Sequence, residues 1–152
     1  MEKRILAKNN QSEILNVQPQ ALEAEQAVLG SMLISKEAVS KVLQWISSEH
    51  FYKEAHAKIF STMIVLFNEN EPVDTISVTD RLKKNKELEA VGGAYYITGL
   101  VESVPTAANV ESYSKIVLEK AVLRRLIYLA HDMSKEAYDD RQTVDDILDS
   151  AE

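Results

Sequence analysis

The sequence predicts an all-α protein, with a compact helical-bundle head followed by a long antiparallel helical hairpin. Apolar residues recur at spacings of three and four over most of the chain, and no stretch alternates in the manner of a β-strand. Only four glycines and three prolines are present, and they are expected to punctuate the helices. With 152 residues, of which 45% are hydrophobic and 27% charged, the chain has the composition of a globular domain and can bury a sizeable core.

The head is expected over residues 18–103. The residues before it, 1–17, are rich in Asn, Gln and Ser and show little periodicity, which predicts a flexible N-terminal tail. The first helix of the head follows Pro19, and Ala21 stands where a capping hydroxyl or amide would be expected. A second helix follows Ser35, which can cap it.

Further helical segments complete the predicted head. The clearest periodicity of the whole chain lies between residues 56 and 67, and the stretch "NENEP" ends it. A shorter helix is expected to begin with the capping-box-like pair Ser77 and Asp80 and to run through Leu82. The pair Gly92-Gly93 then separates this helix from the last head segment, "AYYITGLVES".

The hairpin is expected over residues 104–152. A helical pattern without internal proline or glycine runs from about Asn109, the expected cap, to Tyr138. Such a helix would be about 45 Å long and would overshoot a compact head. Thr143 and Asp146 form a capping-box start for the second arm, and the chain stops within the pattern of that arm, which indicates a truncation.

The stretch "EKAVLRRLIYLA", residues 119–130, places apolar side chains on almost every side of the first arm. A helix that is apolar all round is normally buried in something larger. A hairpin that projects from its head therefore has apolar surface that only another chain can cover. The sequence accordingly predicts self-association.

Composition and charge exclude several classes of function. The net charge of −7 argues against strong DNA binding by this chain alone, because such domains usually carry a basic footprint. The chain has no cysteine, which excludes disulfides and thiolate metal sites. It shows neither a signal peptide nor an apolar run as long as a membrane span, so no membrane partner is expected and the cytoplasm is the expected location.

No catalytic, cofactor or metal site is expected in this chain. Glu23 and Glu25 are two residues apart on a helix and point apart, so we expect first-turn acids favoured by the helix dipole. His56 lies on an apolar face without a second ligand nearby, which predicts a hydrogen-bonded core histidine, and the same expectation covers His50 and His131. No phosphate-binding glycine loop or nucleophile elbow is present.

Four segments, in this order, resemble the N-terminal domain of bacterial DnaB-type replicative DNA helicases. Each segment alone is mainly a helix-packing pattern, whereas four in order make a specific signal. They are "PQALEAEQAVLGSML" (19–33), "HFYKEAHAKIF" (50–60), "EPVDTISVTDRL" (71–82) and "GGAYYITGLVESVPTAANVESYSKIVLEKAVLRRLI" (92–127).

The resemblance implies a part in DNA replication at the bacterial replisome. Proteins of this family are hexameric ring motors that unwind DNA using ATP and Mg²⁺, and their ATPase site lies in a RecA-like C-terminal domain. This chain is expected to end before the linker and the motor. The N-terminal domains form a collar, a trimer of dimers in which the hairpins pair. The collar also binds the helicase-binding domain of primase, and a helicase loader is a further partner.

Carried over by position, the hairpin should supply both subunit pairing and primase docking. The candidates for primase contact are Ile127 and Met133 on the hairpin, with Tyr96 where the head meets it. The candidates for the oligomer interface are Leu123, Leu126 and Ala130, with Arg124 and Arg125 setting register or partner choice through their charge.

Alternatives remain open for these residues and for the chain. Tyr96 is equally compatible with a core aromatic whose hydroxyl reaches the surface, and Met133 with a gap-filling core residue. Ile127 is also compatible with burial in the hairpin seam against Ile147 and Leu148. For the whole chain, the alternatives are a free-standing helical adaptor without a motor domain, and an enzyme using the acidic residues of the head, for which the carboxylate spacing provides no site.

Overall fold

A computed structural model describes residues 17–139 and 141–152 of the chain. Every regular element in these residues is helical, which confirms the predicted fold class. The predicted tail, residues 1–17, lies outside the described residues except for Val17. The elements are α2 (Leu22–Ile34), α3 (Lys36–Leu43), η1 (Ser48–His50), α4 (Glu54–Asn68), α5 (Thr75–Lys84), η2 (Glu89–Val91), α6 (Gly93–Glu102), α7 (Val110–Ala137) and α8 (Val144–Ala151).

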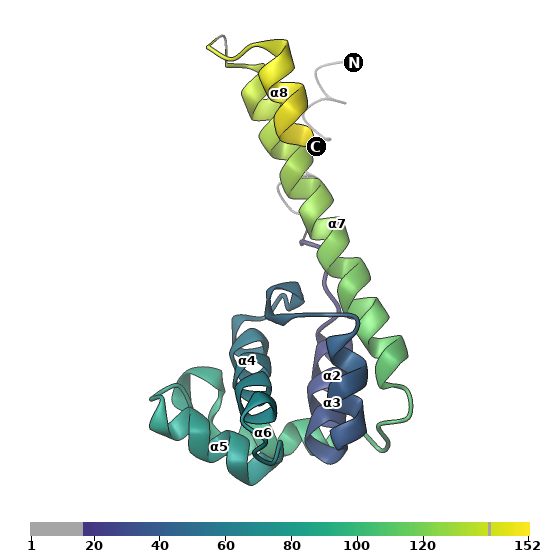
Figure 1. Ribbon diagram of the computed structural model, residues 1–152, viewed down its shortest axis with the longest axis vertical. Coiled ribbons are helices and arrows are strands. Elements are labelled where there is room, and N and C mark those ends of the chain that lie inside the picture. Colours follow the sequence, from purple (N-terminus) through teal and green to yellow (C-terminus); the bar gives the residue numbers. More distant parts are fainter. Residues whose placement is uncertain (1–16, 140) are drawn as a thin grey trace, which may run out of the picture.

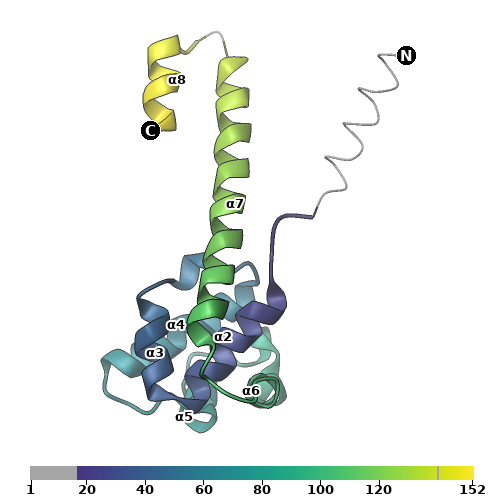
Figure 2. The same ribbon diagram turned by 90° about the vertical axis from the view of Figure 1, so that its right-hand side faces the viewer.

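The helices form a head and a projecting hairpin. Helices α2 to α6 make up the head, and α7 starts against it and then extends far beyond it (Figure 1). Helix α8 turns back and lies along the far end of α7, as Figure 2 also shows. The predicted compact head with a long antiparallel hairpin is therefore confirmed.

Helix α2 is the centre of the head. It contacts α3, α4, α6 and α7, so it is covered on nearly all sides. Its side chains Val28, Leu29 and Met32 have no exposed surface, and they belong to the same core cluster as Ile59 and Met63 of α4. A helix apolar all round is buried in this way by its neighbours.

Gly30 allows α2 and α6 to approach closely, and it is not the helix punctuation expected from the sequence. It lies within α2 and is buried. A Cβ atom added at this position would collide with the carbonyl oxygen of Leu100 on α6 and would lie 2.8 Å from a methyl group of Val104. Since carbonyl oxygens of a helix cannot move aside like a flexible side chain, only glycine fits here.

The predicted helix starts are correct at some positions. The Ser35 hydroxyl accepts a hydrogen bond from the Ala38 N–H at 3.3 Å at the start of α3. The Thr143 hydroxyl does the same for the Asp146 N–H at 3.2 Å at the start of α8. Ala21 precedes α2 and provides no side-chain cap, as its residue type predicts.

Two other predicted caps are wrong. Helix α5 begins before the expected Ser77, and its cap is Asp74, whose carboxylate accepts the Ser77 N–H at 2.8 Å. Asp80 instead forms an ion pair with Lys84 one turn later. Asn109 occupies the position before α7, but its side chain accepts no capping hydrogen bond. Asp74 provides the cap because it comes three residues before an N–H that has no partner within the helix.

The base of α7 is part of the core of the head. Val110, Ser114 and Val117 are buried, and α7 contacts α2 and α3. Beyond these residues no side chain of α7 is buried. The far end of the helix contacts α8, where the Ser150 hydroxyl donates to the Glu136 carboxylate at 2.9 Å. The middle of α7 therefore keeps a free side.

Candidate docking surface on α7

An apolar stripe follows the free side of α7. From Leu123 onward its members recur three, four or seven positions apart on the side of the helix opposite the buried Val110, Ser114 and Val117, and Ile116 at the base lies beside α2. All of them are exposed, and Ile127 keeps 50% of its surface in contact with solvent. We call this set the α7 stripe, and its members are Ile116, Leu123, Leu126, Ile127, Ala130 and Met133.

The second arm does not cover the α7 stripe. Helix α8 has only eight residues, and Leu148 is itself 58% exposed. Ile127 therefore stays half exposed, and the alternative of its burial in the seam with Ile147 and Leu148 is not realised within this chain. Large, contiguous apolar patches of this kind mark interaction sites in proteins.

The two arginines of the stretch lie in different environments. Arg125 is exposed and makes no hydrogen bond or ion pair with the described residues. The guanidinium of Arg124 is held within the chain: Nη1 donates to the Pro19 carbonyl and Nη2 to the His50 carbonyl, both at 2.8 Å. A contribution of either arginine to a subunit interface stays a prediction.

Tyr96 lies on α6 in the head and is not part of the α7 stripe. Its ring is partly buried, and its hydroxyl lies 2.6 Å from Nε2 of His56. The ammonium of Lys53 lies 3.4 Å from the same hydroxyl and 4.7 Å from the centre of the ring. Part of Tyr96 remains accessible, so its role in primase contact stays a prediction.

Behind Tyr96 a buried carboxylate and a buried imidazole are paired. Nδ1 of His56 lies 2.8 Å from Oε1 of Glu25, and these two side chains are 0% and 1% exposed. The Glu25 carboxylate also accepts the main-chain N–H groups of Tyr52 at 2.9 Å and Lys53 at 3.3 Å. The network joins α2, α4 and α6 with the segment that precedes α4.

The donor inventory fixes the direction of two of these hydrogen bonds. The Lys53 ammonium can only donate, so the Tyr96 hydroxyl accepts from it. The Glu25 carboxylate can only accept, so Nδ1 of His56 donates to it. His56 is therefore a hydrogen-bonded core histidine, as predicted.

Sequence reasoning missed the role of Glu25. Glu23 is exposed and Glu25 is buried, so the two carboxylates do point apart, but Glu25 is more than a first-turn acid. The signal that could have identified it is its register, because it stands four residues before Leu29 and seven before Met32, on the core face of α2.

The expectation of a core position is wrong for the other two histidines. His50 is partly exposed at the end of η1, where Nδ1 accepts the Ser47 N–H at 2.9 Å. His131 is exposed on α7.

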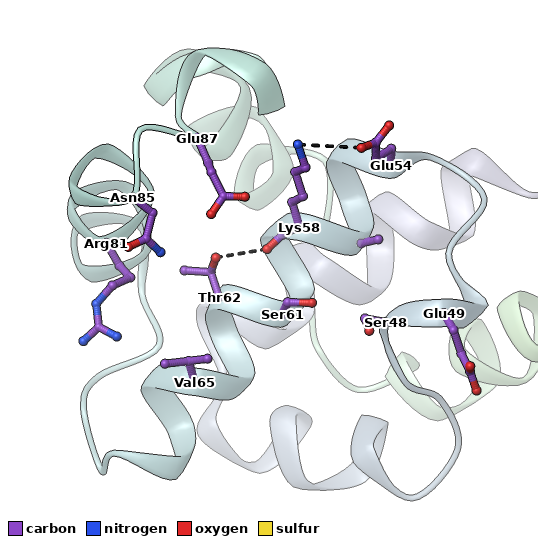
Figure 3. A pocket seen from close by; sticks show the side chains of 11 residues that line it. Ser48, Glu49, Glu54, Lys58, Ser61, Thr62, Val65, Arg81, Asn85 and Glu87 are labelled. Atoms are coloured by element: carbon purple, nitrogen blue, oxygen red, sulfur yellow. Dashed lines mark hydrogen bonds and ion pairs between the residues drawn. The ribbon is translucent and has the colours of Figure 1, made fainter.

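A pocket of about 500 Å³ lies between α4 and α5, with η1 at its rim (Figure 3). Both cationic side chains that line it are already paired with carboxylates, Lys58 with Glu54 at 3.7 Å and Arg81 with Glu69 at 2.6 Å. Hydrogen bonding to Arg81 also lowers the pKa of Glu69. The pocket therefore offers no free positive charge to a nucleotide phosphate.

The described residues do not fit a metal site either. They contain no group of three or more His, Cys, Asp or Glu side chains that could hold a metal ion. Within the same ranges, none of the helices combines the length and the apolar character needed to cross a membrane.

Comparison with known sequences identifies relatives of this chain. The sequence model of the DnaB-like helicase N terminal domain matches residues 17–119. The chain is 44% identical to the replicative DNA helicase DnaC of Bacillus subtilis and 43% identical to the replicative DNA helicase DnaB of Geobacillus stearothermophilus. These matches cover 88% and 90% of this chain and 30% of each relative, so the chain spans about three tenths of their length.

Solved structures show the same architecture. The crystal structure of the N-terminal domain of DnaB helicase from Mycobacterium tuberculosis matches with a TM-score of 0.85 and 38% identity, over 89% of this chain and 95% of that chain. The N-terminal domain of DnaB helicase from Helicobacter pylori, described with its interactions with primase, matches with a TM-score of 0.67 and 19% identity, over 77% and 91%. The chain belongs to the family of DnaB-like helicase N-terminal domains.

Proposed function

We propose that this chain is the assembly and docking domain of a replicative DNA helicase. The α7 stripe carries the proposal, because six apolar side chains lie exposed on a helix that projects from its head (Figure 1). The family relationship supports it, since the relatives are replicative DNA helicases. In a protein of that kind, ATP-driven unwinding with Mg²⁺ belongs to regions other than this chain.

Self-association covers the α7 stripe in this proposal. A stripe along one helix can meet the same stripe of a second copy around a two-fold axis, which makes a self-complementary interface. Leu123, Leu126 and Ala130 lie in the middle of the stripe and form the centre of that interface. Three such dimers then form the hexameric collar.

The strength of this pairing follows from the exposed area. Burying the exposed half of a Leu or Ile side chain contributes about 1 kcal/mol. Association also costs translational and rotational freedom, so several side chains on each partner are needed before the dimer is stable. We therefore expect pairing that depends on protein concentration.

Primase is the proposed second partner, and a helicase loader the third. Ile127 and Met133 lie nearer the tip of α7, where primase can reach them, and Tyr96 lies on the head. The described interaction of the Helicobacter pylori neighbour with primase supports this partner. Because that neighbour is only 19% identical, its similarity supports the fold alone. The choice of contact residues on α7 is therefore based on the exposure of the α7 stripe.

Sedimentation equilibrium tests the self-association. The wild-type chain is expected to show a monomer–dimer equilibrium, and the double variant Leu123→Glu with Leu126→Asp is expected to stay monomeric at the same concentrations. Ile76→Asp is the matched control, because Ile76 is 81% exposed on α5, outside the α7 stripe, and its substitution should leave the equilibrium unchanged. A wild-type chain that is monomeric at high concentration would contradict the proposal.

A further inference from the structure

Two separate contacts hold α7 to the head. The first is the apolar base around Val110 and Val117, which is buried against α2 and α3. The second is Arg124, seven residues beyond Val117 and therefore about 10 Å further along the helix axis. A helix that is held at one point can change its angle to the head, whereas two contacts at a distance from each other fix the direction of the helix.

The contact of Arg124 joins α7 to two segments of the head. Its two terminal nitrogens donate to the carbonyls of Pro19, which precedes α2, and His50, which ends η1, both at 2.8 Å. Its Cζ atom lies 5.4 Å from the centre of the Tyr52 ring, within the range of a cation–π interaction. We call Arg124, Pro19, His50 and Tyr52 the Arg124 clamp.

The head side of the clamp is itself held in place. The main-chain N–H of Tyr52 donates to the buried carboxylate of Glu25, which is anchored by His56. His50 is fixed by a capping box with Ser47: the Ser47 N–H donates to Nδ1 of His50 at 2.9 Å, and the main-chain N–H of His50 donates to the Ser47 hydroxyl. The His50 carbonyl and the Tyr52 ring of the clamp thus lie on a segment that is tied to the core.

We propose that the Arg124 clamp sets the direction in which α7 leaves the head, and with it the position at which the α7 stripe is presented. Arginine suits this task because its planar fork reaches two acceptors at fixed angles, whereas a lysine ammonium is a single point charge. Because both acceptors are main-chain carbonyls, the clamp depends on the arginine and on the backbone path.

The absence of cysteine in the sequence makes a direct test practical. Spin labels are attached to cysteines introduced at Lys41 of α3 and Lys135 of α7, both exposed, and the distance between them is measured by pulsed electron resonance. Mixing the labelled protein with an excess of the unlabelled chain suppresses the distances between labels on different copies. The variants are Arg124→Ala and Arg124→Lys, and the matched control is Arg125→Ala.

The wild-type chain and Arg125→Ala are expected to give the same narrow distance distribution. Arg124→Lys and Arg124→Ala should give a broader or displaced distribution, with unchanged helicity by circular dichroism. A distribution for Arg124→Ala that superimposes on the wild type would overturn the proposal. If Arg124→Ala loses helicity, the Arg124→Lys variant provides the test instead. A distance distribution of Arg124→Lys equal to that of the wild type would show that Arg124 does not set the direction of α7. A loss of helicity in Arg124→Lys as well would show the same.

Discussion

At the scale of single residues, Glu25 is a buried carboxylate that connects three elements of the head. A carboxylate that is 1% exposed would be costly to bury without partners, and here it accepts two main-chain N–H groups and one imidazole N–H. Two of these bonds hold the segment before α4 and the third holds α4 itself, so one side chain orders both. The function of Glu25 is therefore structural.

We expect Glu25→Ala to lower the stability of the chain strongly, by about 3 kcal/mol or more. The substitution leaves the buried imidazole of His56 and two partly buried main-chain N–H groups without their acceptor, and a buried unsatisfied group costs about 1–3 kcal/mol. Urea unfolding followed by circular dichroism measures the change. Glu23→Ala, two residues away and exposed, is the control and should change the free energy of unfolding by a few tenths of a kcal/mol. Equal stability of the two variants would contradict this role.

At the scale of elements, the sequence predicts helix identity well and helix ends less well. The periodicity that marks α4 and α7 is local, so it can be read from neighbouring residues. The start of α5 was misplaced because Asp74, Ser77 and Asp80 are all capping residues, and only the backbone conformation selects Asp74.

Long-range contacts lie beyond such local patterns. The acceptors of Arg124 are 105 and 74 residues away in the sequence, so no spacing rule can reveal them. The same holds for Gly30, because the backbone of α6 leaves no room for a side chain at this position. The candidate stripe on α7 was predictable because an apolar excess is a local property, whereas the partners of its polar neighbours were not.

Two glycines give an opposing pair of predictions for helix packing. Gly30→Ala is expected to destabilise the chain by about 1–3 kcal/mol, because the new methyl group must push α6 away from α2. Gly99→Ala, within α6 and with open space at its Cβ position, should stabilise the chain by about 0.5–1 kcal/mol through its helix propensity. Thermal unfolding of both variants measures this, and a shift of the melting temperature in the same direction would disprove the packing argument.

At the scale of the whole molecule, the fold separates stability from recognition. Most of the buried apolar side chains of the described residues lie in the head around α2, whereas α7 leaves its stripe uncovered. The base of α7 is buried and contributes to stability, whereas the middle of α7 is exposed and available for recognition. Substitutions on the stripe should consequently change binding and leave folding intact.

We expect Ile127→Asp together with Met133→Asp to weaken binding of the primase helicase-binding domain at least tenfold, about 1.4 kcal/mol. A charge in an apolar contact must lose water without gaining a partner. Calorimetric titration measures the affinity, and circular dichroism checks that helicity is unchanged. Ile76→Asp is again the control. If the double variant binds with the same affinity as this control, Ile127 and Met133 do not contribute to primase binding.

The length of α7 beyond Arg124 makes it a lever arm. Thirteen residues separate Arg124 from the end of the helix at Ala137, which corresponds to about 20 Å. A tilt of about 10° at the clamp would then displace the tip by about 3.5 Å, nearly the full range of an apolar contact, about 4.0–4.5 Å. Small changes of angle at the head would thus be amplified into the gain or loss of a partner at the tip.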